Sequence, residues 1–284
     1  MGTLSKLCGF QAQASLITPA EARSRCLPPI EKALALDDFL PEAHMGYASH
    51  MTWQQFNWDA ADVAFRRAIE LNPSYAEARM FYSQYLTLMG RTEEGTEQMR
   101  LALELDPLNP FVQGLHGAQL LMIDDPRGAI RVIEGVMAST PGFGFGYTIT
   151  WVAYHVLGEK DKAIAAAIND FRITRADETG ALALEEAYIN GNYTGALLHA
   201  AEVLADLSKT GYFAPMYIGM LYEQAGQVEK AIDWFEIAYR EHDPEAPFMG
   251  VMTKSSAVHT NPRFIALLRD MKLDYWADKY SQPE

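Results

Sequence analysis

Prolines and turn residues recur along this chain at a fixed step of 34 residues. The prolines are Pro73, Pro107 and Pro141, and the turn residues are Gly90, Asp124 and Gly158. A period of this length is typical of arrays built from two-helix repeats. One helical hairpin cannot bury its apolar face alone, so neighbouring hairpins must stack. We therefore expect an extended array of helical hairpins that holds partners, not a closed globule built for chemistry.

The second helix of each expected hairpin carries small residues at matching positions. The first small position is Ala61, Gly95, Ala129, Ala163, Ala196 and Ala231, and the second, seven residues on, is Ala68, Ala102, Val136, Asp170, Val203 and Ala238. Between them stand Phe65, Met99, Ile133, Ala167, Ala200 and Phe235. Two antiparallel helices pack closely when small side chains lie at the crossing and larger ones beside it.

This layout resembles the tetratricopeptide repeat (TPR) family, whose helix-B pattern is visible as Ala61, Phe65, Ala68 and Pro73. Segments 68–73, 102–107 and 261–269 are also similar to TPR segments of bacterial signalling and regulatory proteins. The resemblance implies an all-α, right-handed α-α superhelical solenoid of TPR hairpins with a C-terminal capping helix. It also implies a partner-binding or assembly role. Separately, the residues show no catalytic or metal-ligand motif, so no catalytic residue, metal or cofactor is expected.

Three segments are expected along the chain. Residues 1–17 form an N-terminal tail, residues 18–244 the TPR array of about six or seven repeats, and residues 245–284 a loop and the capping helix, over 262–271. The first and fifth repeats are irregular. Thr18, Pro19 and Glu21 predict the start of the first helix through a capping box. Pro28 and Pro29 then predict a kink or break.

In TPR arrays, helix A of each hairpin lines the concave face, and its exposed positions form a stripe. Carried onto this sequence, the predicted partner-binding groove comprises Met80, Gln84, Phe111, Ala118, Leu121, Phe145, Thr148, Val152, His155, Glu185, Tyr188, Phe213, Met216 and Met220, followed by Glu223. The stripe lacks the Lys and Asn pairs with which some members bind a carboxylate. An apolar or basic peptide therefore fits it better. The alternative is that these residues pack between repeats or against a curled cap.

The formal net charge of −14 limits the choice of partners. Such a surface repels phosphate backbones and anionic membranes, so neither nucleic acid nor membrane is expected. The seven histidines are scattered without metal-ligand spacing. His155 falls in the predicted groove and is a candidate for pH-dependent binding.

Cysteine use and hydropathy suggest a location. Cys8 and Cys26 are interpreted as free thiols of a reducing compartment. The sequence has no apolar run long enough to cross a membrane and no clear secretory signal. We therefore expect a cytoplasmic protein.

Two other functions stay open at this stage, because a fold does not fix a function. One is a scaffold that self-assembles into homo-oligomers through its irregular ends. The other is an enzyme or small-molecule binder with a pocket walled by Tyr147, Trp151, His155 and Tyr188.

Overall fold

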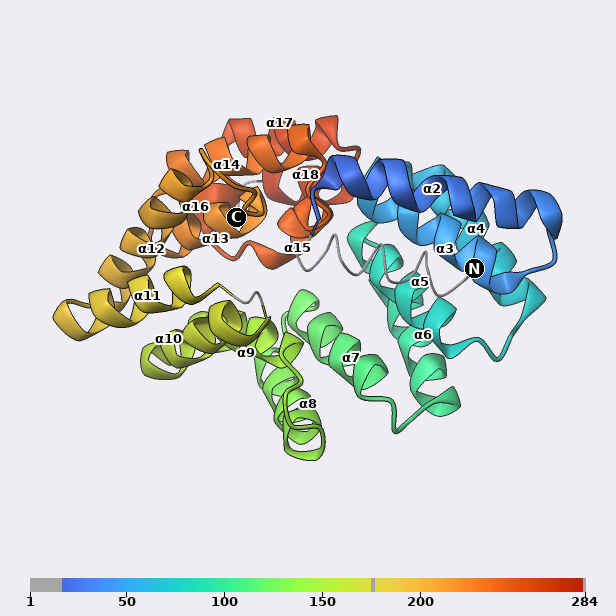
Figure 1. Ribbon diagram of the computed structural model, residues 1–284, viewed down its shortest axis with the longest axis horizontal. Coiled ribbons are helices and arrows are strands. Elements are labelled where there is room, and N and C mark those ends of the chain that lie inside the picture. The colour runs from blue at the N-terminus through green and yellow to red at the C-terminus, as the bar shows by residue number, and fades with distance from the viewer. Residues whose placement is uncertain (1–16, 175–176, 283–284) are drawn as a thin grey trace. The chain divides into compact units, whose positions relative to one another are not determined.

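The computed structural model describes residues 17–174 and 177–282, and in these ranges every regular element is a helix. Helices that follow one another in sequence pack in pairs, as a hairpin array requires. Figure 1 shows the succession of paired helices along the chain. The predicted all-α fold of consecutive helical hairpins is confirmed.

The chain divides into two compact units, described separately here. The first contains the chain up to Pro107 together with Ala238–Pro247, and the second contains Leu108–Ile237 with Phe248–Glu284. The helices of the first unit are α2 (Pro19–Leu36), α3 (Pro41–His50), the π-helix η1 (Met51–Gln55), α4 (Trp58–Leu71), α5 (Ala76–Leu88) and α6 (Thr92–Leu105).

The second unit continues the pairing and ends in short helices. Its helices are α7 (Pro110–Met122), α8 (Pro126–Ser139), α9 (Phe145–Val156), α10 (Lys160–Asn169), the π-helix η2 (Asp170–Thr174), α11 (Glu178–Asn190), α12 (Tyr193–Leu207), α13 (Pro215–Gln224), α15 (Met249–Met252), α16 (Ser256–His259), α17 (Pro262–Asp270) and α18 (Asp274–Ser281). Helix α14 (Val228–Glu241) contributes residues to both units, and the short 3₁₀ helix η3 (Ala246–Phe248) follows it.

The turns inside the hairpins repeat one backbone conformation. Left-handed φ angles occur at Phe56, Gly90, Asp124, Gly158 and Gly226, which all fall on the 34-residue step. After Gly90, the N–H of Arg91 bonds to the carbonyl of Leu86 at 2.8 Å. This bond from the residue after a left-handed one closes a helix in a Schellman motif. The predicted turn positions Gly90, Asp124 and Gly158 therefore end helix A of their hairpins.

The core lies between the two helices of each hairpin, at the positions that the sequence pattern identified. The first small residues, from Ala61 to Ala231, are all buried. Phe65 and Phe235, between the small positions, are also completely buried. Asp170 is a polar exception among these positions. It is buried where a small apolar residue is expected, and it accepts a hydrogen bond from the hydroxyl of Thr148.

Two expectations at the ends of the array are corrected. Helix α2 continues without interruption through Pro28 and Pro29. Its buried face of Ala22, Cys26 and Ile30 recurs every four residues, so packing on this face holds both halves in one helix. The capping helix is present as α17, but the expected loop before it contains the short helices η3, α15 and α16, and α18 follows α17 and packs on it.

Cys26 is disulfide-bonded, so its interpretation as a free thiol is wrong. The only other cysteine of the sequence, Cys8, lies outside the described residues, as does nearly all of the expected tail. Sequence spacing could not reveal this, because pairing depends on the separation of the backbones in the fold. The expectation of a cytoplasmic location therefore loses the support that it drew from free thiols.

Among the described helices, none has the length and apolar character needed to cross a bilayer.

The left-handed turn gives a test of the hairpin geometry. Gly90→Ala should lower the free energy of unfolding by about 1–2 kcal/mol, because a Cβ is strained at its φ of 74°. Gly135→Ala is the matched control: this glycine lies in helix α8, and its added Cβ meets no atom within 4 Å. The control should stabilise the protein by roughly 0.5–1 kcal/mol. Urea unfolding measures both, and equal effects would contradict the assigned turn.

Candidate functional site

The predicted groove residues fall into two groups in the structure. Eight are buried: Met80, Gln84, Ala118, Leu121, Thr148, Val152, Met216 and Met220. The other six, Phe111, Phe145, His155, Glu185, Tyr188 and Phe213, are half-buried. The buried group contributes to packing, which is the alternative weighed for this stripe. A role of either group in partner binding stays a prediction.

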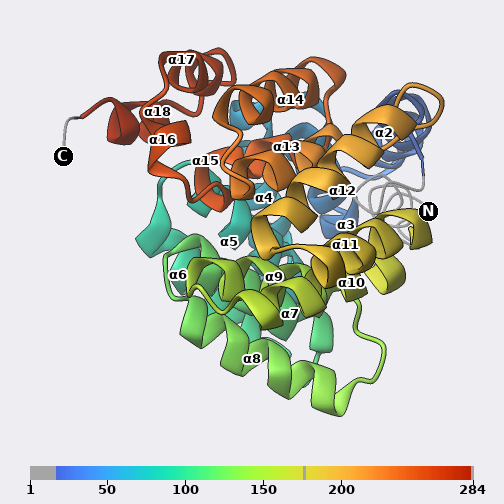
Figure 2. The same ribbon diagram turned by 90° about the vertical axis from the view of Figure 1, so that its left-hand side faces the viewer.

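One of the half-buried residues, Tyr188, lines a cavity of the second unit. The cavity has a volume of about 920 Å³ and lies between the turn that precedes α10 and the turn that precedes α12. It is lined by Gly158, Glu159, Lys160, Asp161, Lys162, Tyr188, Gly191, Asn192, Tyr193 and Thr194. The hairpins α9–α10 and α11–α12 that carry these turns are consecutive in the chain (Figure 2). Most of the lining residues are exposed, so the cavity is accessible from solvent.

Tyrosines and charged side chains shape the walls of this cavity. The hydroxyl of Tyr188 donates a hydrogen bond to the Asp161 carboxylate, which raises the pKa of Tyr188. Lys162 pairs with Glu159 at 2.7 Å and lies over the ring of Tyr154, 5.1 Å from its centroid. The two acidic and two basic residues of the lining balance, so the cavity suits a polar or aromatic side chain better than an isolated ion.

His155 contacts the cavity wall through Tyr193. Its Nδ1 lies 2.8 Å from the hydroxyl of Tyr193, and the two rings stack with centroids 5.7 Å apart. Burial, and to a lesser extent Lys160, lowers the pKa of His155 to about 4. The ring is therefore neutral at physiological pH. The expected pH dependence of binding through His155 does not follow from this geometry.

Of the four residues proposed for a small-molecule pocket, only Tyr188 lines the cavity. His155 reaches it through Tyr193, whereas Trp151 is fully buried in the hairpin core. Sequence reasoning missed Tyr193 and the Gly158–Lys162 turn, because it considered helix-A positions alone. The signal was available, since Gly158 and Asn192 stand one 34-residue step apart at the tips of neighbouring hairpins.

A second polar centre forms at the break between the short helices α15 and α16. Residues 253–255 separate α15 from α16, which leaves the N–H groups of Lys254 and Ser255 outside any helix. Oε1 of the buried Glu223 accepts both, at 2.6 and 2.8 Å. A buried backbone N–H needs such a partner. Glu223, the last position of the predicted stripe, therefore holds this segment of the chain itself.

Lys254 extends the same contact to helix α7. Its Nζ lies 2.7 Å from the carboxylate of Asp124 and 3.4 Å from the carbonyl of Leu121. These interactions lie within the second unit. The segment 253–255 therefore contacts the backbone at Leu121 and the side chain of Glu223, both of them stripe positions.

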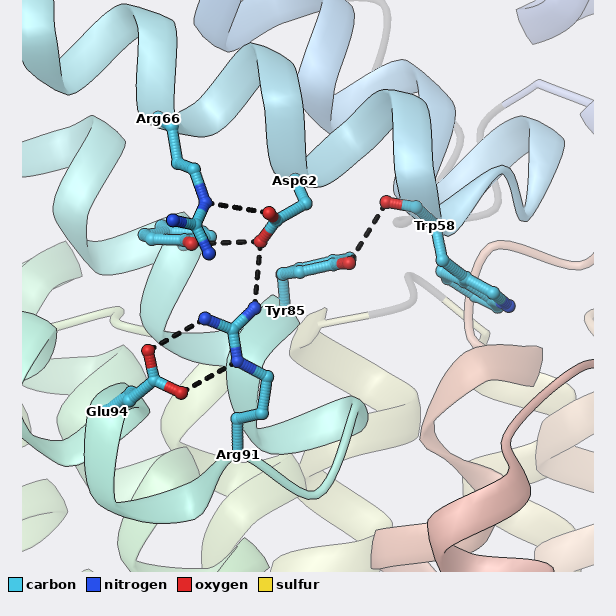
Figure 3. Close-up of polar contacts among 7 residues, drawn as sticks. Trp58, Asp62, Arg66, Tyr85, Arg91 and Glu94 are labelled. Carbon is cyan, nitrogen blue, oxygen red and sulfur yellow. Dashed lines mark hydrogen bonds and ion pairs between the residues drawn. The ribbon is translucent and has the colours of Figure 1, made fainter.

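The first unit contains a network of ionised and hydrogen-bonded side chains (Figure 3). Asp62 on α4 accepts hydrogen bonds from Arg66 at 2.7 Å, from Arg91 at 2.9 Å and from the hydroxyl of Tyr82 at 2.9 Å. Burial raises the pKa of Asp62, but these hydrogen bonds outweigh it, so the net pKa is lowered. The carboxylate is thus stably ionised and ties helices α4, α5 and α6 together. Each of these side chains is bonded to another member of the network, which indicates a structural role.

Comparisons with known proteins support the fold. No protein-family model matches the sequence, and no curated protein matches it either. In structure the chain resembles the human IFIT1 dimer with m7Gppp-AAAA, with a TM-score of 0.56 and 16% identity over 93% of this chain and 68% of that one. At this identity the likeness concerns the fold alone.

Two looser likenesses are to PilF of Pseudomonas aeruginosa and to the C-terminal part of a TPR repeat-containing protein from Cytophaga hutchinsonii. For PilF the TM-score is 0.45, with 14% identity over 84% of this chain and 88% of that one. For the Cytophaga protein it is 0.42, with 15% identity over 98% and 100%. The pairing of its helices and the conformation of its turns show that the chain has a TPR-like fold.

Glu223 gives a pH-dependent test of the contact with the segment between α15 and α16. Burial raises its pKa to about 7, against the lowering effect of the two N–H bonds and Lys254. A raised pKa contributes stability that is fully present below the unfolded value of about 4.5 and is lost as the pH rises through 7. Glu223→Gln keeps the acceptor oxygen without the charge. Between pH 5 and 8 it should lose less stability than the wild type, by on the order of 1–3 kcal/mol.

Urea unfolding of both proteins at the two pH values measures this difference, and other titrating groups cancel in it. The exposed Glu42→Gln variant of the first unit serves as the control and should follow the wild type. The same pH dependence in Glu223→Gln and the wild type would contradict the buried carboxylate.

Proposed function

We propose that this chain is a protein-interaction module that binds an apolar or basic peptide segment of a partner through the α9–α12 hairpins. The observation that carries the proposal is the cavity between two neighbouring hairpins, with Tyr188 and Tyr193 in its wall. Tyrosine contributes much contact area at low entropic cost and is enriched at interfaces. One side chain of the partner would enter the cavity while the flanking residues lie along α9 and α11.

The character of the partner is argued from charge. The chain carries a net charge of −14, and Glu185 near the cavity has a side chain that is 45% exposed although it pairs with Arg172. Electrostatic complementarity then favours a basic segment and accelerates its association. The human IFIT1 dimer was solved with a capped oligonucleotide, m7Gppp-AAAA. For this acidic chain, exclusion of nucleic acid remains our prediction.

Substitution of Tyr188 tests this proposal. Affinity capture from the source cells identifies the partner, and its titration then gives a Kd for each variant. Tyr188→Ser should raise the Kd about tenfold or more, as the loss of a central aromatic anchor does. Ile189→Ser is the matched control, because Ile189 is 76% exposed on the same helix and does not line the cavity. The control should change the Kd by less than about twofold.

Equal Kd values for the two variants would place the partner elsewhere and overturn the proposal. Light scattering on the same samples separates the self-assembling scaffold. If the chain is such a scaffold, the wild type should form concentration-dependent oligomers in the absence of any partner.

A further inference from the structure

Four large apolar side chains are exposed on one part of the first unit. Leu36 is 70% exposed, Phe39 71%, Leu40 39% and Val63 69%. Leu36, Phe39 and Leu40 belong to the connection between α2 and α3, and Val63 lies on α4, which packs against α3. Isolated exposed apolar residues are ordinary, but a group of them marks an interaction surface.

Arg67 links Phe39 to Val63 on the surface, and Leu36 and Leu40 flank Phe39 in the sequence. The guanidinium of Arg67 lies over the ring of Phe39, 5.6 Å from its centroid. Val63 stands one helical turn before Arg67, and residues four apart are neighbours on a helix. The carboxylate of Asp37 accepts a hydrogen bond from the N–H of Phe39 at 2.9 Å, so the turn that presents Phe39 is fixed.

The hairpin geometry does not require these apolar residues. Helices α2 and α4 both end in leucine, at Leu36 and Leu71, and the third residue after each end is Phe39 or Ser74. The second connection makes the same helix-to-helix step with serine where the first has phenylalanine. Phe39 buries little of its own surface, so stability of the unit does not account for it.

The rim of the patch is acidic. The exposed acids around it are Asp37, Asp38, Glu42, Asp59 and Glu70, and the nearby bases are Lys32, Arg66 and Arg67. Arg67 is already paired with Glu70 at 3.0 Å, and His44 contacts Asp38 at 3.3 Å. The rim therefore keeps a negative surplus. It complements a cationic ligand and opposes an anionic lipid surface.

We propose that this patch, formed by Leu36, Phe39, Leu40 and Val63, is a second docking site that takes a basic amphipathic helix of a partner protein. The apolar stripe of such a helix covers the four side chains, and its Lys or Arg residues face the acidic rim. This mode of recognition needs apolar anchors at i, i+3, i+4 and i+7. The patch shares no residue with the α9–α12 cavity, so the two sites are tested independently.

The test uses the full chain and a dye-labelled 18-residue Leu/Lys peptide with leucines at helical spacing. Fluorescence anisotropy gives the Kd of the wild type and of the double variant Leu36→Ser/Phe39→Ser. The double variant should weaken binding about tenfold or more. Val63→Ser should weaken it by a smaller factor, whereas Ile189→Ser, an exposed apolar residue of the second unit, should leave it unchanged. A matched Leu/Glu peptide should not bind.

Circular dichroism shows whether the double variant is folded, and substitutions at positions this exposed should leave the spectrum unchanged. If the peptide binds the folded double variant as tightly as the wild type, the patch is not the site and the proposal fails. A dimer of the wild type that the double variant loses would also overturn it, because the occupant would then be a second copy. Equal binding of vesicles rich in anionic lipid would contradict the acidic rim.

Discussion

The close approach of the two helices in each hairpin is the constraint on which the rest of this structure depends. At Gly95 the approach is so tight that a Cβ would lie 2.8 Å from the carbonyl oxygen of Ser83. Equivalent positions in other hairpins hold alanines that are completely buried, such as Ala129 and Ala163. Small side chains at the crossing let larger neighbours interlock, as ridges do in grooves. Each hairpin then offers a flat apolar side to the next, and burial is shared along the array.

One departure from this regular pattern lies, along the chain, between the two segments that line the cavity. Asp170 occupies a position where the pattern calls for a small apolar residue, and the backbone changes there from α-helix to the π-helix η2. Buried Asp170 is satisfied by the hydroxyl of Thr148. Helix α11 starts shortly after, and its last turn carries Tyr188 into the cavity wall. π-helical segments are frequent at functional sites, and here η2 contacts both α9 and α11.

Local signals determined most of what could be predicted. The sequence signals the ends of α4, α6 and α14, because each helix has a clear apolar period and turn residues at both ends. The capping box at Thr18 and Glu21 is present, with the N–H of Glu21 bonded to the Thr18 hydroxyl.

Contacts between distant residues were not predictable. The carbonyl of Leu121 accepts a hydrogen bond from Lys254, which is 133 residues away in sequence. A stripe on one helix cannot reveal which segment will lie on it, so solvent-facing and covered positions have the same sequence pattern. For the same reason the burial of Met216 and Met220 and the disulfide of Cys26 had no local signal.

The free energies of unfolding of two variants that replace an alanine of helix α10 by leucine test the central claim most directly. Ala163 is completely buried at the helix crossing, whereas Ala165 on the same helix is exposed. If close approach at the crossing holds the hairpins together, Ala163→Leu should cost about 1–3 kcal/mol or more through overpacking. Ala165→Leu should change stability by less than about 0.5 kcal/mol. Similar free energies for the two variants would contradict this account of the array.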